Sequence, residues 1–503
     1  MKQLSITIIF LQLFVFANAQ FQMQNNSKGD GYYANPVFAG DYPDPSIIRD
    51  GDTFYMVHSS FEYYPGLLIW ESKDLINWSP VANALYQYIG SVWAPDLVKY
   101  NSNYYIYFPA SDKIYVVWAP SIEGPWSDPI DLHINSIDPG HVTDENGNRF
   151  LYFANGSYVP LSEDGLTVTG EPKHVYSGWE IPREWSIECF CLEGPKLVKH
   201  GDYYYLTVAE GGTAGPVTGH MIISARSKSP FGPWENSPYN PIEKTYDSSE
   251  RWWSKGHGTL LDDGNGNWWM IFHAYENGHY NMGRQTLMEP VEWTDEDWFI
   301  IPEGIETDEP IKKPELSTVA STYSISDDFK GSGLKPQWKF FGEYDTTRVS
   351  FTGNGVKING KGNGIGNSSP LLCVPSDHSY IADVEMTING DALGGLMLFY
   401  NPQYNSGILA DGKNILANLR GWQFITEHNV SDSHVFLRIK NVNHNVDMFY
   451  SLDGKEWFKI ENSLNVSGLH HNVLSGFMSL RIGLCSVGEG SVTFSNFNYQ
   501  SLH

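Results

Sequence analysis

The stretch that decides the fold is Lys-His-Gly-Asp-Tyr-Tyr-Tyr-Leu, residues 199–206, in which a tight turn is followed by an aromatic strand. Gly and Asp between two strand-like runs are typical of a β-hairpin. The same pattern occurs five times, in residues 49–57, 100–107, 145–153, 199–206 and 264–272. Five copies of one hairpin predict an internal repeat rather than five unrelated turns.

The spacing of the hairpins indicates which repeat this is. Their turn positions, which lie 51, 45, 54 and 65 residues apart, are Gly51, Ser102, Gly147, Gly201 and Gly266. These intervals suit four-stranded blades with loops of variable length, whereas a solenoid repeat would be shorter and less hairpin-like. We therefore predict an all-β fold with a five-bladed β-propeller in residues 30–313. Similar segments that end in Trp, at 73–78, 121–126 and 229–234, support the repeat.

A second β domain is predicted after the propeller. Residues 301–314 are rich in Pro and charge, as a linker would be. Beyond them, residues 380–388 alternate strictly between apolar and polar, and Asp453-Gly454 forms the centre of a hairpin pattern. This composition predicts an all-β sandwich in residues 318–503, with no helix of useful length.

Residues 1–19 have the pattern of a secretory signal peptide. Lys2 precedes an apolar run from Ile6 to Ala17, and Ala17-Asn18-Ala19 is a small-x-small ending. No Cys follows to take a lipid, and no later run approaches the roughly 20 apolar residues that a membrane span needs. We expect an exported protein, periplasmic or secreted, that is soluble and does not insert into membranes.

Charge narrows the class of partner. The formal net charge of −26 opposes binding to nucleic acid and to anionic membrane surfaces. Aromatic residues make up 15% of the chain, which is typical of β-rich cores and also of proteins that stack on sugar rings. An oligosaccharide or polysaccharide is therefore the expected partner.

The chain has four cysteines, which are too few for a disulfide scaffold in a protein of this length. Cys189 and Cys191 are so close in sequence that we expect buried free thiols rather than a bridge. Cys-x-Cys also lacks the second pair that a structural zinc site needs. Cys373 and Cys485 lie in the same C-terminal region, where either a bridge or two free thiols would be compatible with export.

Polar residues occupy equivalent places in all five repeats. Each lies six to nine residues before its hairpin turn, near the start of the strand expected to be innermost in its blade, and they are Asp44, Asp96, Asp138, Glu193 and His257. Side chains at the start of an innermost strand face the central channel of a propeller. The repeat thus predicts a ring of four carboxyl groups and one imidazole.

A ring of acids is suited to glycoside hydrolysis. One Asp before Pro is usually only a turn former, but turn chemistry gives no reason for acids at the same point of successive repeats. Carboxyl groups that share a cavity raise some of one another's pKa values by repulsion. Hydrolysis of a glycosidic bond needs one carboxylic acid to protonate the leaving oxygen and one carboxylate to activate water.

These residues and the motifs around them resemble glycoside hydrolase family 43, especially its β-xylosidases and α-L-arabinofuranosidases. The matching motifs follow the family order in Tyr42-Pro-Asp-Pro-Ser46, Ser59-Ser-Phe-Glu62, Val92-Trp-Ala-Pro-Asp96, Ile137-Asp-Pro139, Glu193-Gly-Pro195, Ala209-Glu-Gly-Gly212, Gly256-His-Gly258 and Met282-Gly-Arg-Gln-Thr286, then in Glu289-Pro-Val-Glu-Trp293. Residues 327–329 and 395–400 are similar to the concanavalin A-like sandwich that accompanies the propeller in the xylosidase-like branch.

The resemblance implies a role for each of three acids. Asp44 would be the general base that deprotonates water, and Glu193 the general acid that protonates the departing oxygen. Asp138 would orient the acid and adjust its pKa. Since Asp44 belongs to the first blade and Glu193 to the fourth, we expect their carboxyl groups about 6.5–9.5 Å apart, the spacing that gives inversion.

Other residues carry weaker expectations. The resemblance implies that Trp93 stacks on the sugar, that Arg284 bonds its hydroxyls and that His257 lies at the floor of the channel. Residues 61–66, which include the predicted substrate contact Phe61, and residues 176–191 are expected to shape the pocket mouth. Asp96 has no catalytic role and is expected to be a buried structural acid.

No cofactor is required for this chemistry. At most, the resemblance implies a structural calcium or sodium ion near His257, which some family members hold through water. A lone His without other ligands at metal-binding spacing more often forms ordinary hydrogen bonds.

The favoured function is an inverting, exo-acting glycosidase on xylose- or arabinofuranose-type residues of plant-type polysaccharides or oligosaccharides. One alternative is a carbohydrate-binding propeller that has lost catalysis, which the intact acids argue against. Another is a family member specific for a different sugar, such as galactose. A sandwich that serves as a separate sugar-binding module is a third.

Overall fold

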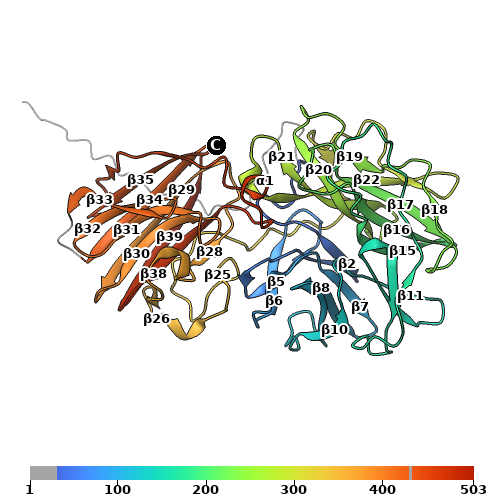
Figure 1. The fold of residues 1–503 in the computed structure, drawn as a ribbon, viewed down its shortest axis with the longest axis horizontal. Helices are drawn as coiled ribbons and strands as arrows, with labels where there is room; N and C mark the ends of the chain where they lie inside the picture. Colours follow the sequence, from blue (N-terminus) through green and yellow to red (C-terminus); the bar gives the residue numbers. More distant parts are fainter. Residues whose placement is uncertain (1–30, 430–432, 503) are drawn as a thin grey trace, which may run out of the picture.

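The computed structural model describes residues 31–429 and 433–502, and it consists of two β domains side by side (Figure 1). The predicted signal peptide, residues 1–19, lies outside the described residues. The predicted five-bladed propeller followed by a concanavalin A-like sandwich is confirmed.

The propeller consists of five antiparallel sheets, one for each hairpin repeat. The first blade consists of β2 (Ser46–Asp50), β3 (Thr53–Val57), β5 (Gly66–Ser72) and β6 (Ser79–Leu85), and the second of β7 (Asp96–Tyr100), β8 (Asn103–Ala110), β9 (Lys113–Ala119) and β10 (Ile130–Ile134). The third consists of β11 (Gly140–Thr143), β12 (Arg149–Phe153), β13 (Ser157–Pro160) and β14 (Lys173–His174), and the fourth of β15 (Glu193–His200), β16 (Tyr203–Glu210), β17 (Met221–Ser227) and β18 (Glu235–Asn236), with β19 (Glu243–Lys244) also on β17. The fifth consists of β20 (Trp252–Asp262), β21 (Trp268–Glu276), β22 (Arg284–Trp293) and β23 (Phe299–Ile300).

Each repeated hairpin forms the first two strands of a blade, and the first strand is the innermost one. In the fourth blade, for example, His200 pairs with Tyr203 across the turn that contains Gly201. The five first strands contact one another in ring order, and β20 contacts β2 to close the ring. This arrangement brings the starts of all five strands to one channel.

The segment before the first blade secures this closure by pairing with the last blade. β1 (Tyr32–Tyr33) pairs with β24 (Ile311–Lys312), which follows the fifth blade. Phe38 pairs with Thr286 of β22, and the Asn35 side chain donates to the Met288 carbonyl at 3.1 Å. The two ends of the propeller are therefore joined by hydrogen bonds.

The sandwich consists of two facing sheets. One has the order β33 (Trp422–Asn429), β32 (Asn414–Leu419), β31 (Asn405–Ala410), β30 (Leu393–Phe399), β38 (Arg481–Val487), β28 (Leu371–Cys373), β25 (Lys339–Phe341) and β4 (Tyr63–Tyr64). The other has the order β26 (Val349–Phe351), β27 (Val356–Asn359), β39 (Ser491–Ser501), β29 (Ser379–Asn389), β34 (His434–Val442), β35 (Asn445–Ser451) and β36 (Phe458–Lys459), with β37 (Leu464–Asn465) also on β35. Short helical turns are η1 (Ala154–Gly156), η2 (Tyr280–Met282), η3 (Thr346–Arg348), η4 (Ile365–Asn367) and α1 (His471–Leu474).

One strand of the sandwich comes from the propeller. β4 leaves the first blade and pairs with β25, so that Tyr64 lies opposite Phe340. Buried residues of both domains form one continuous apolar core at this boundary, with Phe61 and Trp70 on the propeller side and Phe340 on the sandwich side. The two domains are therefore packed against each other through buried side chains.

The cysteine expectations need correction. Cys189 and Cys191 form a disulfide, and Cys189 is exposed, so the prediction of two buried free thiols is wrong. The two Cα atoms lie 5.3 Å apart, within disulfide reach. Cys373 and Cys485 are both free and buried; Cys373 pairs with Ile482, three residues from Cys485 on the adjacent strand.

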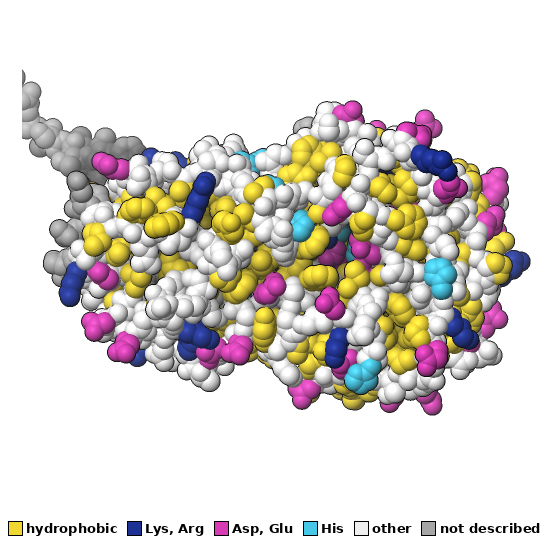
Figure 2. All heavy atoms as spheres, in the orientation of Figure 1, with side chains coloured by type: hydrophobic (Ala, Val, Ile, Leu, Met, Phe, Trp, Pro, Cys, Tyr) yellow, Lys and Arg dark blue, Asp and Glu magenta, His cyan; other side chains and the backbone are white. Residues whose placement is uncertain are grey.

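The surface agrees with the charge of the sequence. Acidic side chains are scattered over both domains on the face shown in Figure 2. Among the described residues, none of the helices is long and apolar enough to cross a membrane.

Candidate active site

Four of the five predicted ring residues converge on one buried cluster. Asp44 immediately precedes the first blade, Asp138 precedes the third, Glu193 begins β15, and His257 lies within β20. His257 is at the centre: its Nδ1 is 3.5 Å from Asp44, and its Nε2 is 3.3 Å from Asp138 and 3.7 Å from Glu193. One imidazole ring thus has Asp44 on one edge and the other two acids on the opposite edge.

Asp44 is held from several sides. Arg284 Nη1 donates to Asp44 Oδ1 at 2.9 Å, and the Ser59 hydroxyl donates to Oδ2 at 2.5 Å. The backbone N–H of Asp44 donates to Nδ1 of His273 at 3.1 Å. With 5% of its side chain exposed, Asp44 has a fixed position and little contact with bulk water.

These contacts keep Asp44 ionised. Burial by itself raises the pKa of Asp44, but the positive charges of Arg284 and His257 and the side-chain contact of His273 with Oδ1 at 3.0 Å outweigh it and hold the pKa well below the usual range. A general base must be unprotonated before the reaction, and these contacts meet that requirement for Asp44.

Glu193 is in the opposite situation. Burial raises its pKa, the negative charges of Asp138 and Asp44 raise it further, and the contact with His257 opposes this rise only in part. Its side chain is 18% exposed, more than that of Asp44 or Asp138. A reachable carboxyl group with a raised pKa can carry a proton to a leaving oxygen.

Asp138 links the acid to the rest of the cluster. Its Oδ2 accepts the N–H of Gly194 at 3.1 Å, which fixes the backbone directly after Glu193, and lies 3.3 Å from His257. Burial lowers the pKa of His257, but the charges of Asp44 and Asp138 raise it to about 10. His257 is therefore an imidazolium that offsets part of the negative charge of the three acids.

The backbone at these positions is strained in the same way. Asp44, Asp138 and His257 all have left-handed φ values, of 56°, 55° and 53°. Non-glycine residues adopt this region at an energetic cost, and such residues cluster at functional sites where the surroundings fix them. The shared backbone geometry explains how the repeat aims three different side chains at one point.

Asp96 does not join the cluster. It pairs with Lys196 at 2.7 Å and accepts the N–H of His141 at 2.7 Å. Lys196 also donates to the carbonyl of Pro95. These bonds connect the second, third and fourth blades, as expected of a buried structural acid.

Residues 33–299 match Glycosyl hydrolases family 43, and residues 326–500 match the domain described as Beta xylosidase C-terminal Concanavalin A-like domain. The first match covers more than half of the chain. This protein belongs to glycosyl hydrolase family 43.

Relatives and solved structures agree with this family. A xylan 1,3-β-xylosidase from Vibrio sp. is 32% identical over 318 residues, which are 54% of this chain and 57% of the relative. A non-reducing end α-L-arabinofuranosidase from Bacteroides ovatus is 32% identical over 342 residues, 63% of each chain. The crystal structure of the GH43 protein BlXynB from Bacillus licheniformis has 26% identity and a TM-score of 0.86, covering 94% of this chain and 100% of that one.

The predicted substrate residues of this family 43 chain have different environments. Arg284 is buried against Asp44, and Trp93 is half-buried with its Nε1 donating to Ser91 at 2.9 Å. Phe61 is only 1% exposed and packs in the core between the domains. Their contacts with sugar stay predictions.

The sandwich also contributes to the site. Phe477 lies 6.1 Å from the ring of Trp93, and the guanidinium of Arg284 lies 5.4 Å from the Phe477 ring. His471 of α1 stacks on Phe477 at 3.8 Å. An aromatic pair from the second domain therefore lies over Arg284, which pairs with Asp44.

Four residues of this site, Ser59, His220, His273 and Phe477, were not predicted from the sequence. Ser59 was part of a quoted motif, but His273 lies on β21, the second strand of its blade, His220 directly precedes β17, and Phe477 is in the other domain. A search of the repeat for polar residues on the second strands would have found His273. No repeat connects Phe477 to the propeller.

The segment 176–191 leads directly into the strand of Glu193. The rings of Trp179 and Trp185 lie 6.0 Å apart, and the Trp179 N–H donates to the buried carboxyl of Glu210 at 2.7 Å. The disulfide between Cys189 and Cys191 lies at the end of this segment. Its role at the pocket mouth stays a prediction.

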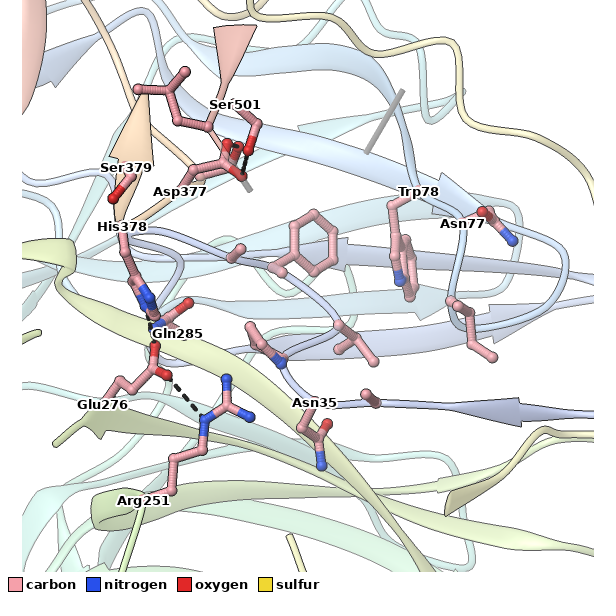
Figure 3. A pocket seen from close by; sticks show the side chains of 18 of the residues that line it. Asn35, Asn77, Trp78, Arg251, Glu276, Gln285, Asp377, His378, Ser379 and Ser501 are labelled. Atoms are coloured by element: carbon pink, nitrogen blue, oxygen red, sulfur yellow. Dashed lines mark hydrogen bonds and ion pairs between the residues drawn. The ribbon is translucent and has the colours of Figure 1, made fainter. Parts of the chain in front are cut away.

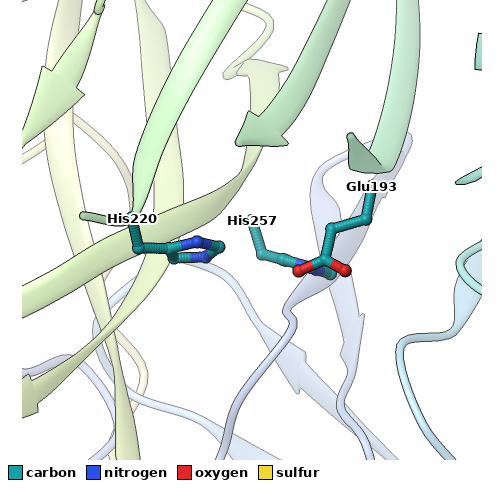
Figure 4. A group of neighbouring side chains, drawn as sticks. All are labelled: Glu193, His220 and His257. Carbon is teal, nitrogen blue, oxygen red and sulfur yellow. The ribbon is translucent and has the colours of Figure 1, made fainter. Parts of the chain in front are cut away.

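A metal ion has one group of candidate ligands among the described residues. Glu193, His220 and His257 have ligand atoms within 4.8 Å of one another (Figure 4). Calcium and sodium prefer oxygen ligands, and both nitrogens of His257 already face carboxyl groups, so direct ligation by this ring does not fit. An ion near His257 that is held through water stays a prediction of the sequence.

A separate cavity of about 290 Å³ lies between the domains, lined by residues 34–39 and 376–379 among others and by none of the three acids (Figure 3). Its charged wall is already paired: Glu276 accepts from Arg251 at 2.9 Å and from His378 at 2.7 Å. This wall joins the sandwich to the propeller.

Proposed function

We propose that this chain is an exported, exo-acting glycoside hydrolase that removes xylose- or arabinofuranose-type residues with inversion. The observation that carries the proposal is the asymmetric cluster around His257, which has an ionised Asp44 on one edge and a Glu193 of raised pKa on the other. The names of the relatives, xylosidase and arabinofuranosidase, support the sugar class.

In the proposed reaction, Asp44 accepts a proton from a water molecule as that oxygen forms a bond to the anomeric carbon. The bond between the anomeric carbon and the glycosidic oxygen breaks at the same time, and Glu193 donates its proton to the leaving oxygen. Asp44 ends protonated and Glu193 ionised, so protons and charge balance, and exchange with solvent restores both.

The surrounding residues prepare this reaction. Arg284 and His257 lower the cost of keeping Asp44 charged, while burial and the charge of Asp138 raise the pKa of Glu193, and Asp138 fixes the N–H of Gly194. Asp44 and Glu193 contact different nitrogens of the His257 ring, which holds their carboxyl groups apart, and we expect a water molecule rather than Asp44 itself to attack the anomeric carbon. This arrangement supports inversion rather than retention.

Export is part of the proposal. The signal-like pattern of residues 1–19 supports it, and the Cys189–Cys191 disulfide is typical of an oxidising compartment. The expected partner is an oligosaccharide or polysaccharide.

The test is a panel of aryl glycosides that compares β-xyloside, α-L-arabinofuranoside and galactoside. The proposal expects hydrolysis of the xyloside, the arabinofuranoside or both, and loss of that activity in Asp44→Asn. Hydrolysis of only the galactoside would overturn the sugar class. No hydrolysis of any glycoside, combined with saturable sugar binding, would favour the inactive carbohydrate-binding alternative.

A further inference from the structure

Residues 479–481 of the sandwich contact the propeller close to the loop that carries Asp44, the proposed base. The Leu480 N–H donates to the carbonyl of Asn281 at 3.1 Å, a backbone hydrogen bond between the domains. The next residue, Arg481, begins β38, and its Nη2 lies 3.6 Å from Oδ2 of Asp41. An arginine of the second domain thus pairs with an aspartate three residues before the proposed base.

Both members of this pair are buried. The side chains of Arg481 and Asp41 are 6% and 1% exposed. The guanidinium of Arg481 also lies 3.3 Å from the centre of the Tyr63 ring, which β4 carries from the propeller into the sandwich. Arg481 is therefore fixed between two propeller side chains.

Asp41 also contacts the backbone next to Arg284, the residue that pairs with the proposed base Asp44. A Cβ atom added to Gly283 would lie 2.3 Å from Oδ1 of Asp41, so the carboxylate packs directly on the Gly283 backbone. Arg284 follows at once, and its carbonyl accepts the N–H of Tyr42 at 3.0 Å. The loop of the base and the residue that pairs with the base therefore meet at Asp41.

Because Asp41 is buried, the stability of its charged form depends on the nearby guanidinium of Arg481. Burial raises the pKa of Asp41, and the charges of Arg481 and Arg284, followed by contacts with the Ser479 side chain and the Arg284 backbone, oppose this rise. A buried carboxylate that loses its cation is strongly unfavourable and either takes up a proton or moves toward water. Each response would loosen the contact with Gly283.

We propose that Arg481 is a positioning residue for catalysis, which holds Asp41 and thereby fixes the loop of Asp44 and the guanidinium of Arg284. The inference rests on the proposed function, because it assigns the role of base to Asp44. It makes the sandwich part of the catalytic apparatus through a charge that does not touch the substrate.

The kinetic test uses Arg481→Met and Arg481→Lys with a matched control. Arg438 has the same two kinds of contact, an ion pair with Asp383 and a guanidinium 3.8 Å from the Trp457 ring, but all of its partners are in the sandwich. Arg438→Met therefore removes the same chemistry without changing the propeller.

We expect Arg481→Met to lower kcat about 10- to 100-fold with KM within about threefold, since small displacements of catalytic groups have effects of this size. Arg481→Lys should restore most of kcat, and Arg438→Met should leave it unchanged. In the Arg481→Met background, Asp41→Asn should lower kcat further by less than twofold. A wild-type kcat in Arg481→Met, an equal loss in Arg438→Met, or fully additive effects of Arg481→Met and Asp41→Asn would overturn the proposal.

A second measurement needs no substrate. Hydrogen–deuterium exchange of the peptide that covers residues 41–46 should be faster in Arg481→Met than in the wild type and in Arg438→Met. Unchanged exchange would overturn the positioning role. If exchange responds but Asp44→Asn keeps full activity, the assignment of the base fails while the structural coupling stands.

Discussion

The two sides of the channel treat a carboxyl group in opposite ways. On the base side, Asp44 has a guanidinium, a hydroxyl and an imidazolium around it and is almost fully buried. On the acid side, Glu193 contacts the same imidazolium but has no guanidinium beside it; burial and the negative charge of Asp138 raise its pKa, and it is more exposed. The difference shows that the same position of a repeat can give an anion or a proton donor, according to the charges that the neighbouring blades supply.

The largest expected effect comes from removing either carboxylate. Asp44→Asn and Glu193→Gln should each lower turnover by about 10²–10⁴-fold, the usual contribution of a general base or acid. The two should differ in leaving-group dependence: Glu193→Gln should lose less on an activated aryl glycoside than on an oligosaccharide, whereas Asp44→Asn should lose as much on both. Steady-state kinetics with both substrates measure this.

Asp202→Asn is the matched control, because this exposed turn residue belongs to the same blade as Glu193. It should have wild-type rates. Near-wild-type activity of Asp44→Asn or Glu193→Gln on the oligosaccharide would be incompatible with the assignment of that residue.

Asp138→Asn should reduce the difference between the pKa values of Glu193 and Asp44. Glu193 acts in its protonated form, so activity is lost as pH rises through its pKa, and the charge of Asp138 raises that pKa. Removal of the charge should move the alkaline limb of the kcat profile to lower pH and lower the rate about 10- to 100-fold. An unchanged alkaline limb would contradict this role.

Phe477→Ala should sharpen the contrast by affecting only the base side. The ring lies beside Trp93 and Arg284, so its loss should lower kcat/KM about 3- to 10-fold, the size of a typical aromatic contact, without moving the alkaline limb. The control is Phe458→Ala on β36, in the sandwich sheet that does not contain β38, and it should have no effect. Equal effects of the two substitutions would exclude a role for Phe477 in the site.

Asp96→Asn should have the smallest effect on activity. This ring acid belongs to neither side, and its bond to Lys196 links blades. We expect kcat within about threefold of the wild type, but a free energy of unfolding about 3 kcal/mol lower, because Lys196 would stay buried without its partner. Chemical denaturation and kinetics of the same sample test both parts, and a large loss of kcat with unchanged stability would reverse the interpretation.

The repeat explains why much of this site could be predicted from sequence. Since each blade begins with the same strand, the positions of Asp44, Asp138, Glu193 and His257 follow from their distance to a recognisable turn. The contacts outside the repeat could not be predicted. Phe477 and Arg481 reach the propeller only through packing of the two domains, which leaves no periodic signal.

Local backbone geometry also could not be predicted from the sequence pattern. The short spacing of Cys189 and Cys191 argued against a bridge, but the backbone between them places their Cα atoms 5.3 Å apart, within disulfide reach. Likewise, nothing in Tyr63-Tyr64 indicates that β4 would leave its blade to pair with β25. Both outcomes depend on φ values and partners that single residues do not reveal.

The most direct test of the account is the anomeric configuration of the first product, observed by proton NMR early in hydrolysis before mutarotation. An ionised Asp44 and a protonated Glu193 on opposite edges of His257 predict that the sugar is released with its configuration inverted. Release of the sugar with its starting configuration would mean direct attack by a carboxylate, and it would contradict the assignment of Asp44 as a base.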